Sequence, residues 1–254
     1  MAKGSYYKKY RETNEGEEEE RLPVVNISDD VRKEYEDGKL LLIDKPLHWT
    51  SFDVVRKIRS SIRIKKVGHA GTLDPLASGL LIVCTGKFTK QINTLMAAEK
   101  EYSGSFTLGA ITPTYDLESL PEQHMPVDEI TLSRIREAAK LFTGRIMQFP
   151  PVYSAIKKAG TPLYELARRG EAVDPEARPV TISSFEITEW DEPVAKFKVS
   201  CSTGTYIRSL AHDLGKELGC GAYLSELRRT RIGEFKVEDA MTMKEFISSL
   251  ERSS

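Results

Sequence analysis

The segment of residues 67–87 constrains the fold and the chemistry of this chain more than any other stretch. Two glycines, Gly68 and Gly71, allow the backbone to make a tight or left-handed turn. Pro75 fixes its own φ and keeps Asp74 out of the helical region, and the apolar run LLIVC follows. The pattern predicts a stiff loop that carries the Asp74 carboxylate beside a buried strand, a mount suited to a nucleophile or general base. An Asp before Pro also commonly starts an ordinary turn, and spacing alone favours that simpler interpretation.

Periodic patterns predict the elements on either side of this loop. Thr50 can cap a helix whose third position is Asp53, close to a capping box, and the apolar residues of that helix recur on one face. Further helices are predicted at Thr131–Phe142 and from Gly204 to just before Gly219. Strands are predicted at Lys39–Asp44, Tyr102–Leu108, Val180–Glu189 and Ala195–Ser202, the last two as an antiparallel pair.

Composition excludes several classes of protein. No apolar run approaches the roughly 20 residues of a membrane helix, and the polar N-terminus has no secretory-signal pattern. The three cysteines are widely spaced, which is typical of reduced thiols in a cytoplasmic protein. The histidines show no metal-ligand spacing. We therefore expect a cytoplasmic globular protein that binds no metal and no membrane.

The charges are distributed unevenly along the chain. Residues 1–38 hold 7 Lys or Arg and 11 Asp or Glu, a net charge of −4, and the remaining 216 residues have a net charge of +3. We interpret residues 1–38 as a polar acidic extension, largely disordered, and residues 39–254 as the folded domain. Basic residues gather at Arg63–Lys66, next to Asp74 in the sequence, at Lys157–Arg169 and at Arg228–Arg231, which suits a phosphate backbone.

The run GHAGTLDPLASGLL, residues 68–81, closely resembles the signature of the TruB family of tRNA pseudouridine synthases. In that family the Asp of this motif is the catalytic residue, which corresponds to Asp74. Four further segments resemble family motifs in the family's order: DKPLHWTS from Asp44, the strand and loop from Tyr102 to Asp116, GTYIRSL from Gly204, and LSELRRTR from Leu224. Two positions depart from the family pattern, since His48 replaces a usual Gly and Pro113 replaces a usual acidic residue.

The resemblance implies a role for particular residues. Tyr102 is expected to stack on the target base, Arg208 to pair with Asp74, and His69 to help hold the substrate loop open. Leu227 is expected to line the base pocket, and the arginines that follow it to face RNA. The full set of expected site residues is catalytic Asp74, Tyr102 and Arg208, with substrate-binding Lys45, His69, Asp116, Tyr206, Leu227, Lys157 and Arg228.

The resemblance also implies a fold and an activity. The fold is the α/β (α+β) pseudouridine-synthase core, a long mixed, mainly antiparallel sheet flanked by helices, with a thumb-like insertion at about residues 148–176 that grips the RNA. Only a short tail follows Arg231, so no full PUA domain is expected. The activity is isomerisation of uridine 55 in the T loop of tRNA by a monomer without a cofactor or protein partner, acting on a flipped-out base. Attack of Asp74 on the pyrimidine ring and attack on the sugar C1′ are both open.

Two other functions are compatible with a glycine-rich loop and basic segments. One is a catalytically silent tRNA-binding or tRNA-folding module, against which the presence of Asp74, Tyr102 and Arg208 argues. The other is a small-molecule phosphoryl enzyme, against which the absence of the GxxxxGK[ST] pattern argues.

Overall fold

The computed structural model describes residues 25–252 except residues 155, 159, 172 and 174, and its chain divides into two compact units. The first unit runs to Tyr102 and resumes at Leu227–Ser254, and the second is Ser103–Glu226. Within the described residues no helix is both long and apolar enough to cross a membrane. The first unit contains α3 (Asp29–Asp37), β1 (Leu40–Lys45), α4 (Ser51–Ile62), β2 (Val67–His69), β3 (Ala77–Thr85), the 3-10 helix η1 (Gly86–Gln91), α5 (Ile92–Ala97), β11 (Phe235–Lys236), the 3-10 helix η2 (Val237–Asp239), β12 (Met241–Thr242) and α9 (Met243–Arg252).

The second unit contains α6 (Leu132–Lys140), β5 (Gly144–Gln148), β6 (Lys157–Lys158), β7 (Thr161–Pro162), α7 (Leu163–Arg168), β8 (Arg178–Asp191), β9 (Val194–Cys201) and α8 (Ile207–Leu218). Strands β4 (Lys100–Leu108) and β10 (Ala222–Ile232) have residues in both units. Ten strands share one hydrogen-bonded sheet, in which β1 pairs with β12 and β3 with β10 in parallel, whereas β1–β3, β8–β9 and β5–β8 are antiparallel. The expected mixed, mainly antiparallel sheet is confirmed.

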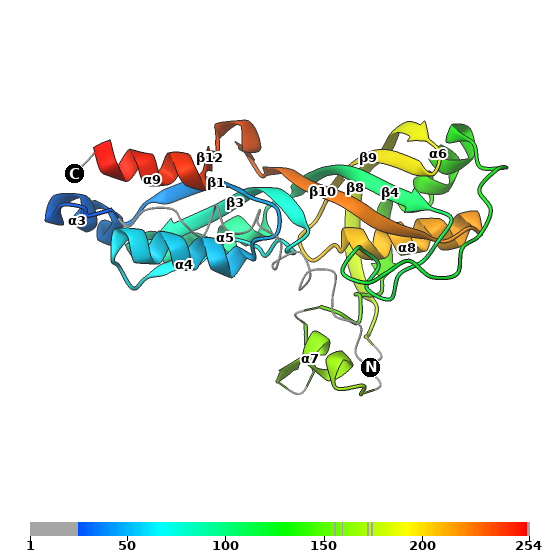
Figure 1. The fold of residues 1–254 in the computed structure, drawn as a ribbon, viewed down its shortest axis with the longest axis horizontal. Coiled ribbons are helices and arrows are strands. Elements are labelled where there is room, and N and C mark those ends of the chain that lie inside the picture. The colour runs from blue at the N-terminus through cyan, green and yellow to red at the C-terminus, as the bar shows by residue number, and fades with distance from the viewer. Residues whose placement is uncertain (1–24, 155, 159, 172, 174, 253–254) are drawn as a thin grey trace. The chain divides into compact units, whose positions relative to one another are not determined.

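Strand β3 is the centre of the first unit, in the order β12-β1-β3-β10. Its side chains alternate between two apolar clusters because successive residues of a strand point to opposite faces. Leu81 and Val83 pack with residues of α3, α4 and α9 on one face, and Leu80 and Ile82 pack on the other with Ala70, which precedes Asp74. A strand covered on both faces must be apolar throughout, which explains its continuous apolar run. Figure 1 shows β1 and β3 among these helices.

The N-terminal boundary differs from the prediction. Residues 1–24 lie outside the described part of the chain, but α3 begins at Asp29 under a Ser28 cap. Tyr35 and Val25 are buried in the same cluster as the core helices, and the Tyr35 ring meets Phe246 edge-on at 6.4 Å. Residues 25–38 therefore pack with the first unit, although the predicted folded domain begins at residue 39, because a few apolar side chains spaced along a polar helix suffice to anchor this segment.

The C-terminal segment also differs from the expected short tail. After β10 the chain forms β11, η2 and β12 and ends in α9, whose Met243, Phe246, Ile247 and Leu250 are buried. The spacing of these four residues places them on one face of the helix. Residues 235–252 are thus part of the first unit's core rather than an appendage.

The second unit has the strand order β10-β4-β9-β8-β5, with α6 lying against β8 and α8. The predicted pair of strands is confirmed as β8 and β9. Helix α8 ends at Gly219, which has a φ of 76° that favours glycine, as its sequence predicted. The region expected as a thumb contains the β6–β7 hairpin and α7.

Candidate active site

The loop that carries Asp74 is held by hydrogen bonds on both sides of that residue. The buried Ser51 hydroxyl accepts from the Leu73 N–H at 2.9 Å and donates to the Leu73 carbonyl at 3.2 Å. The Pro75 carbonyl accepts from the His48 N–H at 2.8 Å, and the Asp74 carbonyl accepts from Ala77 N–H at 3.0 Å. Asp74 itself is half-buried. The expected stiff mount beside a buried strand is therefore present.

Arg229 fixes the start of the same loop. Its side chain is buried, and its guanidinium donates to the Leu80 carbonyl at 2.8 Å and to the Gly71 carbonyl at 3.1 Å. The expectation that the arginines of this segment face RNA is wrong for Arg229. Arg229 pairs with Gly79 in the parallel β3–β10 ladder. A Cβ added at Gly79 would lie only 2.3 Å from the Arg229 carbonyl oxygen. Only a glycine lets the two strands approach this closely.

His69 lies at the end of β2, opposite Val83 of β3. Burial lowers the pKa of its imidazole, and the nearby Arg229 guanidinium lowers it further, although a hydrogen bond with the Gly71 backbone acts in the opposite direction. The imidazole is therefore held in its neutral form at physiological pH. A neutral imidazole can both donate and accept a hydrogen bond beside the loop.

Lys45 and His48 shape the segment that lies against the Asp74 loop. Lys45 is fully buried, and its ammonium donates to the carbonyls of Pro46 at 2.8 Å and Trp49 at 2.6 Å. His48 has a φ of 68° in the left-handed region, where a non-glycine residue is strained. The chain thus keeps at His48 the backbone conformation that the family's usual glycine adopts easily. Lys45 supports the loop here, and its contact with substrate stays a prediction.

Three further expected site residues belong to the first unit. Leu227 is half-buried and pairs in register with Ala77, three residues after Asp74. Arg228 makes a two-pronged contact with Asp44, at 3.0 and 2.7 Å, while its side chain remains 41% exposed. Tyr102 is buried in β4. Their roles toward RNA stay predictions.

The basic run Arg63–Lys66 lies away from Asp74. Val67, which follows it, pairs with Thr85 at one end of β3, whereas Asp74 precedes Ala77 at the other end. At about 3.3 Å per residue, these ends are roughly 26 Å apart. Closeness to Asp74 in the sequence therefore does not place this basic run close to Asp74 in the structure.

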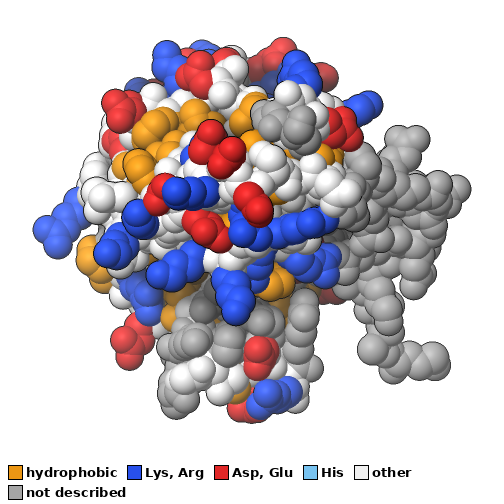
Figure 2. Space-filling view, turned by 90° about the vertical axis from the view of Figure 1, so that its left-hand side faces the viewer, with side chains coloured by type: hydrophobic (Ala, Val, Ile, Leu, Met, Phe, Trp, Pro, Cys, Tyr) orange, Lys and Arg blue, Asp and Glu red, His pale blue; other side chains and the backbone are white. Residues whose placement is uncertain are grey.

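Figure 2 shows the side of the molecule that carries α3, α4 and α9, where Lys and Arg side chains form a band interspersed with Asp and Glu.

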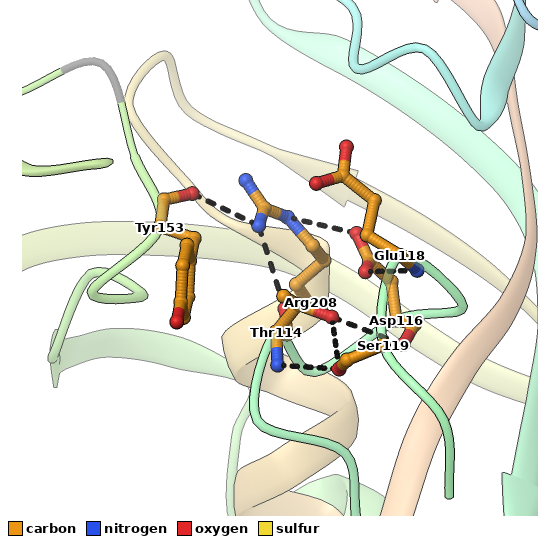
Figure 3. A network of polar contacts seen from close by, with 6 residues as sticks. All are labelled: Thr114, Asp116, Glu118, Ser119, Tyr153 and Arg208. Carbon is orange, nitrogen blue, oxygen red and sulfur yellow. Dashed lines mark hydrogen bonds and ion pairs between the residues drawn. The ribbon is translucent and has the colours of Figure 1, made fainter. Parts of the chain in front are cut away.

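The second unit holds a polar network around Arg208, drawn in Figure 3. Arg208 is the second residue of α8 and is buried, so it is not the surface residue that a first-turn arginine often is. Its guanidinium donates to the carbonyls of Tyr153 at 3.0 Å and Thr114 at 3.4 Å, and its Nε lies 3.7 Å from the buried Asp116 carboxylate. The carboxylate offsets the unfavourable placement of a cation at a helix N-terminus.

The loop around Asp116 is ordered by its own hydrogen bonds. The Asp116 carboxylate accepts from the Glu118 N–H at 2.9 Å, and the Ser119 hydroxyl contacts both the N–H and the hydroxyl of Thr114, at 3.1 and 2.7 Å (Figure 3). Asp116 was expected to bind substrate. In this structure it orients Arg208, and any contact with substrate stays a prediction.

Gln148 is a residue that sequence reasoning did not single out. Its buried amide donates to the Tyr206 carbonyl at 3.0 Å and accepts from the Tyr206 N–H at 2.8 Å. The next carbonyl, of Phe149, accepts from the Ser209 hydroxyl at 2.7 Å. The segment that starts the expected thumb is thus attached along the first turn of α8. The signal in the sequence was a Gln directly before an aromatic residue and two prolines.

The expected site residues fall into two groups. Asp74, Lys45, His69, Tyr102, Leu227 and Arg228 belong to the first unit, and Arg208, Asp116, Tyr206 and Lys157 to the second. The pairing of Asp74 with Arg208 therefore stays a prediction, and the Lys157 side chain lies outside the described part of the structure. Among the described residues, no three His, Cys, Asp or Glu side chains are grouped so that they could hold a metal ion.

Two family models match the chain. The model of the TruB family pseudouridylate synthase N-terminal domain matches residues 59–207, and that of the tRNA pseudouridylate synthase B C-terminal domain matches residues 208–253. A curated protein of Flavobacterium johnsoniae named tRNA pseudouridine synthase B is 50% identical over 226 residues, which cover 86% of this chain and 99% of that protein. A protein of the same name from Chloroherpeton thalassium is 44% identical over 223 residues, which cover 86% of this chain and 92% of that protein.

Solved structures are also similar. A chain in a structure described as "Crystal Structure of a Cbf5-Nop10-Gar1 Complex" matches with a TM-score of 0.66 and 33% identity over 86% of this chain. A second, described as "Structure of H/ACA RNP bound to a substrate RNA containing 2'-deoxyuridine", matches with a TM-score of 0.63 and 30% identity over 85% of this chain. This chain spans 56% and 54% of those two chains.

Proposed function

Because the chain belongs to the TruB family of pseudouridylate synthases, we propose that it isomerises uridine to pseudouridine at position 55 in the T loop of tRNA. The observation that carries the proposal is the mount of Asp74. Its loop is tied to Ser51, His48 and Arg229 by hydrogen bonds to the residues around Asp74. A carboxylate that must meet one atom of a substrate needs such preorganisation, since a misplacement of about 1 Å can cost a hundredfold in rate.

The reaction rearranges atoms within one nucleotide. The bond between the sugar C1′ and N1 of uracil breaks, the base turns, and C1′ joins C5, while C5 loses a proton and N1 gains one. The atoms balance without a cofactor. Asp74 acts as the nucleophile, and attack at C6 of the ring and attack at C1′ are both compatible with a carboxylate on this loop.

The substrate base must leave its stack before Asp74 can reach it, at a cost of a few kcal/mol. We assign Tyr102 to stack on the flipped base, Leu227 to line its pocket and neutral His69 to hold the loop open. Arg208, oriented by Asp116 and the Tyr153 carbonyl, is assigned to pair with Asp74. We assign exposed basic residues and the thumb segment to contacts with the RNA backbone, which supply much of the affinity without reading sequence.

The test is to incubate the purified protein with full-length tRNA and with an isolated T-arm stem-loop, and to map pseudouridine in each. We expect the modification at one uridine of the T loop in both RNAs. Asp74→Asn should lower turnover by on the order of a thousandfold or more while RNA affinity stays within about threefold. The control is Asp128→Asn, which changes an exposed carboxylate of the second unit.

Each rival outcome is distinct. Binding without turnover by the unmodified chain would show a silent RNA-binding module. Turnover of Asp74→Asn near the level of the unmodified chain would remove Asp74 from the mechanism. Activity only on full-length tRNA would show that the enzyme needs contacts beyond the T arm.

A further inference from the structure

Exposed apolar side chains gather around the Asp74 loop. In the described part of the first unit, four large apolar residues are exposed: Leu47 at 48%, Phe52 at 59%, Phe88 at 42% and Met96 at 40%. Met96 lies beside Gly71 at the start of the loop, and Leu47 and Phe52 adjoin the residues that bind its far side. Phe88 lies beyond the opposite end of β3. Clustered exposed apolar groups mark interaction sites more often than scattered ones do.

The hydrogen bonds of the loop place Phe52 close to Asp74. The Ser51 hydroxyl is hydrogen-bonded to both the N–H and the carbonyl of Leu73. Phe52, which follows Ser51, and Asp74, which follows Leu73, are therefore neighbours. The hydrogen bond keeps the Cα atoms of Ser51 and Leu73 within about 7 Å, and with about 3.8 Å for each further Cα step the Cα atoms of Phe52 and Asp74 are roughly 14 Å apart or less. On the other side of Asp74, Leu47 precedes His48, whose N–H binds the Pro75 carbonyl. The backbone segments that carry Leu47 and Phe52 therefore lie next to the loop on either side of Asp74.

The Phe52 ring is exposed on a rigid support. It lies in the first turn of α4, which a complete capping box between Thr50 and Asp53 fixes. Its neighbours Ser51 and Val54 are buried, so the backbone of this turn cannot move freely. One helical turn further, Arg56 is also exposed, in contact with Asp53 at 3.0 Å. An aromatic face with an arginine beside it is a common arrangement for binding an unpaired nucleotide, by stacking on the base and by contact with its phosphate.

Building on the proposed function, we propose that Phe52 is a stacking site for an unpaired base of the substrate RNA next to the target uridine, with Leu47 extending the apolar surface. When the target base flips out, its former neighbours in the loop lose a stacking partner. An aromatic ring held within reach of the reactive carboxylate can replace that partner. Stacking of this kind tolerates any base, so it adds affinity and positioning without a sequence requirement.

A protein partner fits this surface less well. Stable protein interfaces bury about 1,200–2,000 Å² in total, which needs 20 to 30 residues on each side. The exposed apolar cluster around the loop consists of only three large side chains, Leu47, Phe52 and Met96, which is far fewer residues than such an interface needs.

The experiment compares Phe52→Ala, Phe52→Leu and Phe52→Tyr with the unmodified protein, measuring the Kd for T-arm RNA, kcat and KM. Phe88→Ala is the matched control, because it removes an exposed Phe of the same unit that follows the C-terminal end of β3, whereas Asp74 precedes the N-terminal end of that strand. We expect Phe52→Ala to raise Kd and KM about tenfold, Phe52→Leu to raise them nearly as much, and Phe52→Tyr to match the unmodified protein. Phe88→Ala should change neither constant by more than about twofold.

Three results would overturn the inference. Equal Kd for Phe52→Ala and the unmodified protein would exclude a contact. Full rescue by Leu would show an apolar contact that is not stacking. Self-association of the unmodified protein that Phe52→Ala abolishes would identify a protein interface instead. Turnover by the unmodified protein in the same assay separates these outcomes from a failure of the proposed function, which would show as no pseudouridine at all. The unfolding temperature of each variant, expected to be unchanged, excludes misfolding as the cause.

Discussion

The Arg229 guanidinium donates a hydrogen bond to the Gly71 carbonyl at 3.1 Å, across 158 positions of sequence. The same group donates to the Leu80 carbonyl in a buried contact, whereas the contact with Gly71 is partly buried. One arginine of β10 therefore fixes two points of the polypeptide that lie before and after Asp74. The precision of the catalytic loop depends on a strand from the far end of the chain.

Replacing Arg229 by Met should damage both stability and turnover. The change removes the donor from the buried Leu80 carbonyl, at a cost of about 1–3 kcal/mol, and from the partly buried Gly71 carbonyl, at a smaller cost. The loop also loses its anchor at Gly71, so kcat should fall by at least about tenfold with RNA affinity little changed. Denaturant unfolding and single-turnover kinetics measure the two effects. Arg231→Met is the control. Arg231 lies on the same strand as Arg229 but binds the half-exposed Glu99, so this variant should change kcat by less than about threefold.

Ser51→Ala should lower kcat with little change in KM. The hydroxyl serves both the N–H and the carbonyl of Leu73, and its removal leaves both groups buried and unmatched, at a cost of about 1–3 kcal/mol. We expect a five- to fiftyfold loss in kcat, on the scale of a small misplacement of the reactive group. Ser60→Ala removes an exposed hydroxyl from the same helix and should have no effect on turnover. An unchanged kcat for Ser51→Ala would show that Asp74 needs no such support.

Asp116→Ala tests whether the network around Arg208 acts as a unit. Removing one member of a buried ion pair leaves an uncompensated charge and typically costs about 3–5 kcal/mol. We expect a fall in the unfolding temperature and a loss of turnover, whereas Ser119→Ala, which disturbs only the Thr114 end of the loop, should cost less. A double variant, Asp116→Ala with Arg208→Met, should recover part of the stability but none of the activity. Additive losses in stability would show that the two side chains are not coupled.

Local patterns predicted the local elements well. The capping box of Thr50 and Asp53 is complete, and the glycine at the end of α8 has the expected left-handed conformation. The run LLIVC predicted a buried strand because a strand covered on both faces must be apolar at every position. Such features depend on residues within a few positions of one another, which is the range that a sequence pattern reports.

Contacts between distant segments were harder to predict. Nothing in the local sequence distinguishes the buried Arg229 from the half-exposed Arg228, because burial follows from the register of β10 against β3. Gly79, a glycine inside an apolar strand, was the available signal of a close backbone approach. The position of Arg63–Lys66 was misjudged for a similar reason, since β2 runs antiparallel to β3 and carries that run away from Asp74.

Asp213→Asn should stabilise the protein at neutral pH and lose its effect in acid. Burial raises the pKa of the Asp213 carboxyl from 3.8 to about 6, although Lys216 opposes the shift. Above about pH 6 the folded protein holds a partly buried charge that unfolding releases to water, so the neutral amide favours the folded state. Below pH 3.8 the carboxyl is protonated in both states and the difference disappears. Unfolding free energies of both proteins at pH 8, 5 and 4 measure this trend, and a constant difference across that range would contradict it.

Two N-terminal truncations should behave differently. Residues 1–24 hold five Lys or Arg and six Asp or Glu, with the run Glu17–Glu20, and we expect their removal to leave stability and turnover unchanged. Removal of residues 1–37 also deletes Val25 and Tyr35, and with Tyr35 the carbonyl that accepts from the Thr85 hydroxyl at 2.8 Å. Loss of a buried aromatic residue costs about 3–5 kcal/mol. The longer truncation should therefore lower the unfolding temperature clearly.

RNA binding separates the electrostatic effect of the extension from its structural effect. The acidic run can repel phosphate at low ionic strength, so the protein without residues 1–24 should bind T-arm RNA slightly more tightly there. This gain should vanish at physiological salt, where the Debye length is about 8 Å. Equal binding at both salt concentrations would mean that the extension does not act on RNA. A large loss of turnover on removing residues 1–24 would instead show that Tyr6, Tyr7, Tyr10 or their basic neighbours contact the substrate, contrary to our expectation.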